Sequence, residues 1–211
     1  MTTNLIMSNR VRKVHISTMT GKLLGIPAIN TDTTSNAFCN AMFKEGRKDN
    51  NVCTHCYSQN MLRTFRKTCV TAFRRNSETL SERELTDQET PILNATYVRM
   101  HGHGELINDV HLENFYRVAE ANPATTFALW TKRKDLIRSA RTKPSNMILV
   151  YSNPKLDKVF KAVPLGFDKV FNNITNEYPE QDKANCTGQK CASCLACYTH
   201  SGATVIVEHV K

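Results

Sequence analysis

Four cysteines near the carboxyl terminus have the spacing of metal ligands. Cys186, Cys191, Cys194 and Cys197, the terminal cysteine set, lie within twelve residues in the pattern C-x4-C-x2-C-x2-C. The first three match the spacing of plant-type ferredoxins, and the C-x2-C-x2-C core matches that of bacterial ferredoxins. The pattern favours an iron–sulfur cluster. A four-cysteine zinc site is the alternative, since it uses the same ligands and similar gaps.

A second group, the first cysteine set, consists of Cys39 and the C-x2-C pair Cys53 and Cys56. Three thiolates on a [4Fe–4S] cluster leave one iron open for a substrate or cofactor, as catalytic zinc sites keep one position free. The alternatives are a zinc site completed by His55, or a single zinc site shared by the two distant C-x2-C pairs. The eighth cysteine, Cys69, is expected to be a buried core thiol.

The segment 101–105 combines two imidazoles, a carboxylate and two glycines. His101, His103 and Glu105 are candidate catalytic residues, because a histidine pKa near neutrality suits proton transfer, metal ligation or phosphate contact. Gly102, Gly104 and Glu105 are candidates for contact with a cofactor. The alternative is a solvent-exposed turn in which Gly102 and Gly104 serve only the backbone geometry. The segment lacks the third glycine of a dinucleotide fingerprint.

Alternating apolar runs and helical patterns must position these residues. Strands separated by helical stretches of this size predict βαβ units and an α/β fold with a parallel sheet. A closed eight-stranded barrel usually needs about 250 residues, so an open parallel sheet or a partial (β/α) barrel fits this chain better. A loop carrying Cys39 is expected at 30–51. Strands are expected at 12–16, 95–100, 125–130, 146–151, 168–171 and 204–208, and helical patterns at 58–80, 109–121, 134–141 and 155–162.

Polar side chains follow the expected strands at their carboxyl ends, where open α/β sheets bind ligands. Asn153 is a candidate cofactor contact there, although asparagine is also an ordinary turn residue. The only tryptophan, Trp130, ends a strand and is expected in the core. The polar clusters are 101–105, 131–133, 152–153 and 172–173.

Composition limits the class of protein. The chain has 211 residues, a hydrophobic content of 40%, and no run near the roughly 20 apolar residues of a membrane span. We expect one α/β domain over 1–211, with a cysteine-rich metal-binding segment at 180–200 inside it. No signal peptide is evident, so a cytoplasmic protein is expected, in which clustered cysteines more often bind metal than form disulfides.

A net charge of +9 favours an anionic partner such as a nucleotide or nucleic acid. Arg63, Lys67 and Arg74 fall near one face of the helix expected at 58–80, which would allow them to follow a phosphate backbone. A second basic run covers 132–143. The alternative is that both runs are solvated helix faces.

Five segments together resemble phage proteins of the gene product 88 type. They are "LLGIPAINTDTTSNAFC", "CTHCY", "VRMHGHGELIND", "TTFALWTKR" and "KCASCLACY", which span roughly Lys22 to Tyr198. That family resembles, more distantly, the radical S-adenosylmethionine enzymes, which use a partial α/β barrel. The usual radical pattern is C-x3-C-x2-C, whereas thirteen residues separate Cys39 from Cys53 here, and His55 replaces the usual aromatic residue.

The resemblance implies a role for each cysteine set. Cys39, Cys53 and Cys56 would hold a [4Fe–4S] cluster whose open iron binds S-adenosylmethionine, and the segment Gly102–Glu105 would contact the amino group of that cofactor. The terminal cysteine set would hold an auxiliary cluster. The first hypothesis is therefore a radical-type enzyme acting on a nucleotide or nucleic acid in the cytoplasm of an infected host. The second is a non-catalytic zinc- or cluster-stabilised protein that binds nucleic acid or a host protein.

Overall fold

A seven-stranded, mostly parallel sheet organises the protein. The structure is a computed structural model that describes residues 11–45 and 50–210. The strands lie in sequence order from β1 to β7, with β1 antiparallel to β2 and all later neighbours parallel. Within the described ranges β1 and β7 do not pair, so the sheet is open, as predicted. The strands are β1 (Ile16–Ser17), β2 (Ala28–Ile29), β3 (Tyr97–Met100), β4 (Thr126–Thr131), β5 (Met147–Leu156), β6 (Lys169–Ile174) and β7 (Val205–His209).

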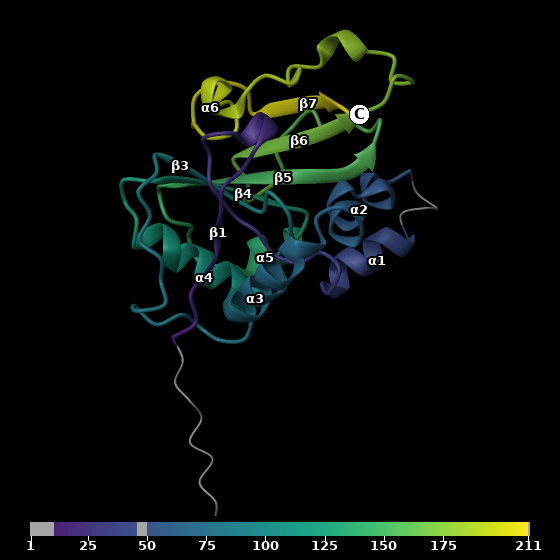
Figure 1. Cartoon of the computed structure of the whole chain (residues 1–211). Coiled ribbons are helices and arrows are strands. Elements are labelled where there is room, and N and C mark those ends of the chain that lie inside the picture. The colour runs from purple at the N-terminus through teal and green to yellow at the C-terminus, as the bar shows by residue number, and fades with distance from the viewer. Residues whose placement is uncertain (1–10, 46–49, 211) are drawn as a thin grey trace, which may run out of the picture.

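Helices connect the strands. Figure 1 shows α3, α4 and α5 on one face of the sheet, α1 and α2 beside the end of β5, and α6 near the start of β7. Within the described ranges, no helix has the length and apolar character needed to cross a membrane. The α-helices are α1 (Ala37–Glu45), α2 (Tyr57–Arg63), α3 (Val70–Ser81), α4 (Asp109–Glu120), α5 (Lys134–Ser139) and α6 (Cys191–Cys194). Short 3-10 segments are η1 (Gly21–Leu23), η3 (Val52–His55), η4 (Lys67–Cys69) and η5 (Gln181–Lys183).

The main core fills the space between the sheet and helices α3, α4 and α5. Alternate strand residues point toward these helices, because successive side chains of a strand face opposite sides. Full burial of each such side chain contributes about 1.5–3 kcal/mol. The sheet supplies Val98, Met100, Phe127, Leu129, Met147 and Leu149, and the helices supply Leu80, Leu112, Phe115, Tyr116, Leu136 and Ile137.

The opposite face of the sheet, here called the inner face, carries a smaller core. It contains Ala128 and Trp130 of β4 together with Ile148 and Val150 of β5. Segments from both ends of the chain cover it, with Ile26 from one side and the buried ring of Tyr198 from the other. The central strands are therefore buried on both faces, which explains their nearly continuous apolar runs.

Asn76 of α3 fastens the amino-terminal strands to the main core. Its side chain accepts a hydrogen bond from the His15 backbone N–H at 2.7 Å, and it donates to the carbonyls of His15 at 2.8 Å and Asn30 at 2.9 Å. Asn76 is fully buried, so these bonds have no competition from water. One side chain thus fixes both the approach to β1 and the loop that follows β2.

Three expected elements were wrong in detail. The helix expected at 58–80 is broken after Arg63, because Thr64 leaves helical geometry (φ −115°, ψ −103°) and its hydroxyl bonds back to the Asn60 carbonyl at 2.6 Å. Cys39 lies in helix α1 and not in a loop, since Asn36 accepts a hydrogen bond from the Cys39 N–H and caps the helix. The segment 155–162 is not helical, because β5 continues to Leu156.

Cys69 also differs from its expected place. It is only half-buried, in η4 directly before α3, and belongs to neither core. The break at Thr64 removes the continuous helix whose apolar face would have buried it. Cys69 is therefore a thiol outside the core and outside both cysteine sets.

We expect Asn76→Ala to lower the free energy of unfolding by roughly 2–4 kcal/mol, because it removes three buried hydrogen bonds and leaves their backbone partners unsatisfied. Urea unfolding followed by circular dichroism measures the change. The neighbouring Arg75 is exposed, so Arg75→Ala should change the stability by less than about 0.5 kcal/mol. Equal effects of the two substitutions would contradict the proposed fastening.

Candidate functional site

The first cysteine set lies beside the carboxyl ends of the central strands. Cys39 is placed by Asn36, which accepts from its N–H at 3.2 Å and donates to the Glu105 carbonyl at 3.1 Å. Cys53 is placed by Asn51, whose side chain accepts from its N–H at 2.9 Å. Two buried asparagines therefore orient the two ligand-bearing segments.

The segment that carries Cys53 and Cys56 is attached to the long strand β5. Asn51 and Lys155 form an antiparallel bridge, and the Leu156 N–H donates to the Asn50 carbonyl at 3.0 Å. Beyond Cys56, the Tyr57 hydroxyl donates to the Gly102 carbonyl at 2.6 Å. The C-x2-C pair is thus held between the end of β5 and the loop after β3.

The three thiols share one electrostatic environment. Burial raises the pKa of Cys39 and of Cys53, and the charges of Glu105 and the other thiols raise it further, while the Lys132 ammonium lowers it. Burial by itself lowers the pKa of Lys132, but the surrounding thiols and Glu105 outweigh burial and raise that pKa. The three thiols of the first cysteine set therefore all act electrostatically on the Lys132 ammonium.

Lys132 has no carboxylate partner at ion-pair distance among the described residues. Its ammonium donates to the Ser152 hydroxyl at 3.1 Å. A partly buried cation is costly unless acidic groups compensate its charge, and Glu105 and the three thiols are the acidic groups that act on Lys132. In residues 11–45 and 50–210, no three or more His, Cys, Asp or Glu side chains are grouped closely enough to hold a metal ion.

Glu105 is fixed by groups at the ends of β3 and β4. Its buried carboxylate accepts hydrogen bonds from the Leu106 N–H at 2.9 Å, the Lys132 N–H at 2.9 Å and the Thr131 hydroxyl. Burial raises the pKa of Glu105, opposed by the Lys132 charge and these hydrogen bonds. The carboxylate thus joins two strand ends beside the thiols.

The two glycines of the same loop allow it to approach the segment after β2. A Cβ on Gly104 would lie 2.0 Å from the Thr31 hydroxyl oxygen, and Gly104 has a φ of +123°. A Cβ on Gly102 would lie 2.8 Å from the Asn30 side-chain oxygen. Both glycines therefore serve close packing at this site.

His103 is also at the site. It is buried against the rings of Tyr57 and Phe73, and its Nδ1 lies 2.9 Å from the Ser58 hydroxyl. Burial, together with Arg66 and Arg99, lowers the pKa of His103 to about 4. His103 is therefore neutral at pH 7, and its role in proton transfer there would be that of a proton acceptor.

His101 points away from the thiols into the main core. Its ring packs against His111 and Phe115, and its Nδ1 lies 3.2 Å from the Trp130 carbonyl. Burial lowers the pKa of His101 to about 3 and places that of His111 well below its usual range. The Nε2 atoms of His101 and His111 are buried without a hydrogen-bond partner among the described residues.

Asn153 is fully buried at the irregular end of β5. Its amide donates to the Lys158 carbonyl at 2.6 Å and to the Asn172 side chain at 3.0 Å, and its oxygen accepts from the Lys155 N–H. Its hydrogen bonds hold the turn between β5 and β6. The structure therefore uses Asn153 within the fold, apart from the first cysteine set.

The terminal cysteine set lies along β7 and α6. Cys186 pairs with β7 through the Val207 carbonyl, and its sulfur is 3.9 Å from the Glu208 carboxylate. Burial raises the pKa of Cys197 to about 12, the Arg99 charge lowers it, and the other three thiols of the set raise it. The other three thiols of the set thus act electrostatically on Cys197, and the metal site expected from the spacing stays a prediction.

Basic side chains accompany this set too. Lys22 forms an ion pair with Glu208 and acts on Cys186 and Cys191. Lys169 is buried on the inner face and donates to the Ala203 carbonyl at 3.0 Å. Burial lowers the pKa of Lys169, and the charge of Cys197 opposes this effect. The roles of Tyr57, Arg99 and Lys169 near the cysteines were not expected from the sequence. Arg99 and Lys169 are basic residues at strand positions that face the inner side of the sheet, and a basic residue in an otherwise apolar strand was the signal that could have found them.

The two basic runs do not form the continuous faces expected from sequence. Arg133 pairs with Asp135, Lys143 with Asp168, and Lys132 lies beside the thiols. Arg63 and Lys67 are not on the helix that carries Arg74, which pairs with Asp32. Several of these basic side chains are therefore paired with acidic side chains within the fold.

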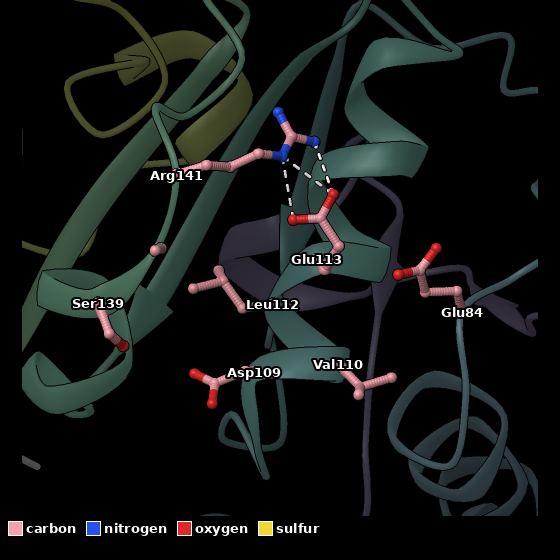
Figure 2. Close-up of a pocket in the computed structure, with 8 residues that line it drawn as sticks. Glu84, Asp109, Val110, Leu112, Glu113, Ser139 and Arg141 are labelled. Atoms are coloured by element: carbon pink, nitrogen blue, oxygen red, sulfur yellow. Dashed lines mark hydrogen bonds and ion pairs between the residues drawn. The ribbon is translucent and has the colours of Figure 1, made fainter.

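A surface pocket of about 370 Å³ lies on the side of α4 and α5, away from both cysteine sets. Figure 2 shows the Arg141 guanidinium turned onto the Glu113 carboxylate at its rim. Arg141 also donates to Glu120 at 2.7 Å. The lining holds neither a thiol nor an imidazole, and its arginine is already paired.

A family model described as Gene product 88 matches residues 3–181. The matched range contains the first cysteine set and the loop 101–105, and it ends before the terminal cysteine set. Neither the curated proteins nor the solved structures include a match. The family match therefore bears on the first site alone.

We expect Gly104→Ala to destabilise the protein by about 2 kcal/mol or more, because the new Cβ would collide with Thr31 in a backbone conformation that favours glycine. Gly21→Ala is the matched control, since Gly21 also has a positive φ (+63°) but open space around it. Thermal unfolding of both variants measures the difference. Equal losses would show that close packing against Thr31 is not the reason for the glycine.

We expect the stability to fall as the pH decreases from about 6.5 toward 4. Unfolded histidines titrate near pH 6.5, whereas the fold holds the pKa of His103 at about 4 and that of His101 at about 3. The unfolded state therefore binds more protons in this window, which favours unfolding. Urea midpoints measured at several pH values test this. His111→Leu should flatten the dependence, whereas replacing the exposed His200 by Gln should leave it unchanged.

Proposed function

The chain belongs to the gene product 88 family, and we propose that it is an iron–sulfur protein in which Cys39, Cys53 and Cys56 hold a [4Fe–4S] cluster with one open iron. One observation carries the proposal. Three thiols from two separate segments act electrostatically on one partly buried lysine that has no carboxylate ion pair, at the carboxyl ends of parallel strands. This edge of an open α/β sheet is where ligands bind.

The donor set fits such a cluster. Thiols bind metal as thiolates, so ligation must overcome the burial that raises the pKa of Cys39 and Cys53. The Lys132 ammonium opposes that rise and would neutralise part of the negative charge of the bound thiolates. The Cys39 and Cys53 segments are each fixed by an asparagine side chain, which leaves little ordering to be done on binding.

The open iron is proposed to bind S-adenosylmethionine, as the resemblance to radical enzymes implies. The chemistry that a [4Fe–4S] cluster and S-adenosylmethionine would supply together, when both are bound, is the one-electron reductive cleavage of the sulfonium. The residues of this chain would shape the site: Gly104 packs against Thr31, Glu105 is held by Leu106 and Lys132, and Tyr57 anchors the C-x2-C segment to Gly102. Neutral His103, which packs against Tyr57, could accept a proton from a ligand there. We propose a nucleotide or nucleic acid as the substrate class on the net charge of +9.

The terminal cysteine set is proposed to hold a second, auxiliary cluster. Its four thiols influence one another, and Lys22, Arg99 and Lys169 surround them with positive charge. These cysteines lie beyond the range of the family match, so this part of the proposal stands on spacing and electrostatics alone. Zinc in this set would leave the first site unaffected.

Anaerobic purification and analysis of iron, sulfide and zinc test the proposal. We expect about four iron and four sulfide per chain for one cluster and about eight for two. Cys56→Ala should lose the iron and sulfide of the first cluster, whereas Cys69→Ala, which removes the thiol outside both sets, should keep them. Cys194→Ala should lower only the iron and sulfide of the second cluster. Stoichiometric zinc without sulfide would refute the iron–sulfur proposal.

The enzymatic part has its own readout. With dithionite and S-adenosylmethionine, the wild-type and Cys69→Ala proteins should form 5′-deoxyadenosine, and Cys56→Ala should not. Iron and sulfide at full stoichiometry without this product would refute the enzyme and leave a structural or regulatory cluster.

A further inference from the structure

We propose that Arg99, on the inner face of the sheet, binds an oxyanion, the phosphate or carboxylate group of a small substrate. Calling the ligand a substrate rests on the proposed function, whereas the binding of an oxyanion does not.

Arg99 is held in one orientation. Its guanidinium carbon lies 3.7 Å from the ring centre of Trp130, and its Nε donates to the His101 carbonyl at 3.2 Å. Stacking on an aromatic face and one hydrogen bond to backbone restrict the side chain in advance. The Nη groups are the remaining donors, and a planar guanidinium matches a carboxylate or phosphate in a bidentate fashion.

Small residues flank Arg99 within the sheet. Its register partners are Ala28 on β2 and Ala128 on β4, the smallest side chains that still have a Cβ. Arg99 itself is half-buried, in contrast to the fully buried Val98 and Met100 that alternate with it. Arg99 is therefore flanked within the sheet by small residues and keeps part of its surface exposed.

No carboxylate neutralises this cation. Among residues 11–45 and 50–210, no Asp or Glu makes an ion pair with Arg99. The groups whose charge would act on it are the phenols Tyr198 and Tyr57 and the thiols Cys197 and Cys191. The hydroxyl of Tyr198 is buried near Arg99 without the geometry of a full hydrogen bond. Phenols and unligated thiols are neutral at pH 7, so a partly buried positive charge stands without a counter-ion.

The position of Arg99 between the two cysteine sets favours the binding of an external ligand over a role in compensating the charge of one set alone. Arg99 is influenced by Tyr57, which follows Cys56, and by Cys191 and Cys197 of the terminal set. The terminal set already has Lys22 and Lys169 beside it. An oxyanion on Arg99 would hold a small molecule on the inner face, within reach of either site.

The only tryptophan of the chain reports on this site, because the guanidinium lies on its ring. The full-length protein, with its metal content measured, is titrated with inorganic phosphate and with acetate, and sodium chloride of equal ionic strength is the reference. We expect a saturable change of Trp130 emission with phosphate or acetate and none with chloride. The anion that binds more tightly, phosphate or acetate, identifies the oxyanion class. Calorimetry of the same titration provides a second readout.

Arg99→Gln should weaken binding at least tenfold, and Arg99→Lys should weaken it less, because the charge remains but the bidentate fork is lost. Arg138→Gln, at an exposed position of α5, is the matched control and should bind as the wild type does. If Arg99→Gln does not fold by circular dichroism, Arg99→Lys decides the test. An absent response in the wild type, an equal response to chloride, or unchanged binding in the Arg99 variants would overturn the inference. Loss of metal from the terminal set with unchanged anion binding would assign Arg99 to that set instead.

Discussion

The short parallel pairing of β2 with β3 is the contact on which the candidate site depends. The pair comprises only two residues of β2, and hydrogen bonds beyond the strands extend it: Thr31 N–H to the His103 carbonyl at 3.0 Å, and His103 N–H to the Asn30 side chain at 2.7 Å. This arrangement brings the segment leading to Cys39 against the loop that contains Glu105. Without it, the two parts of the first site would belong to separate loops.

Charge placement divides the sheet into two different faces. The face toward α3, α4 and α5 is apolar and holds neutral histidines in its core. The inner face and its carboxyl edge hold Arg99, Lys132 and Lys169, none of which pairs with a carboxylate among the residues described. Buried cations are retained when anions compensate them. For Lys132 and Lys169, the neighbouring thiols are acidic groups that could serve that purpose as thiolates.

The sequence was sufficient for features encoded locally. The apolar runs that became β3 to β7, and the polar loops after them, follow from periodicity. The grouping of Cys39 with Cys53 and Cys56 was expected from their spacing, and their relation to the loop of Glu105 only from the resemblance. Features that depend on distant partners were not predictable. The stacking of Arg99 on Trp130 and the inward orientation of His101 each need a neighbour far along the chain. The break at Thr64 has a local cause, the hydrogen bond to Asn60, which the apolar periodicity did not reveal. The ion pairs of the basic run at 132–143 could not be predicted either, since its acidic partners Glu113, Glu120 and Asp168 lie on other elements.

The strand order has a consequence for how the protein assembles. Each strand pairs with the one made just before it, so the sheet can grow one edge strand at a time as the chain leaves the ribosome. The segments that bear Cys39, Cys53 and Cys56 can settle once β5 has formed, because β5 anchors Asn50 and Asn51. The terminal cysteines are synthesised last, and Cys186 docks on β7, the final strand. Loading of the two cysteine sets would then be separated in time, with the second set completed only when the whole sheet is in place.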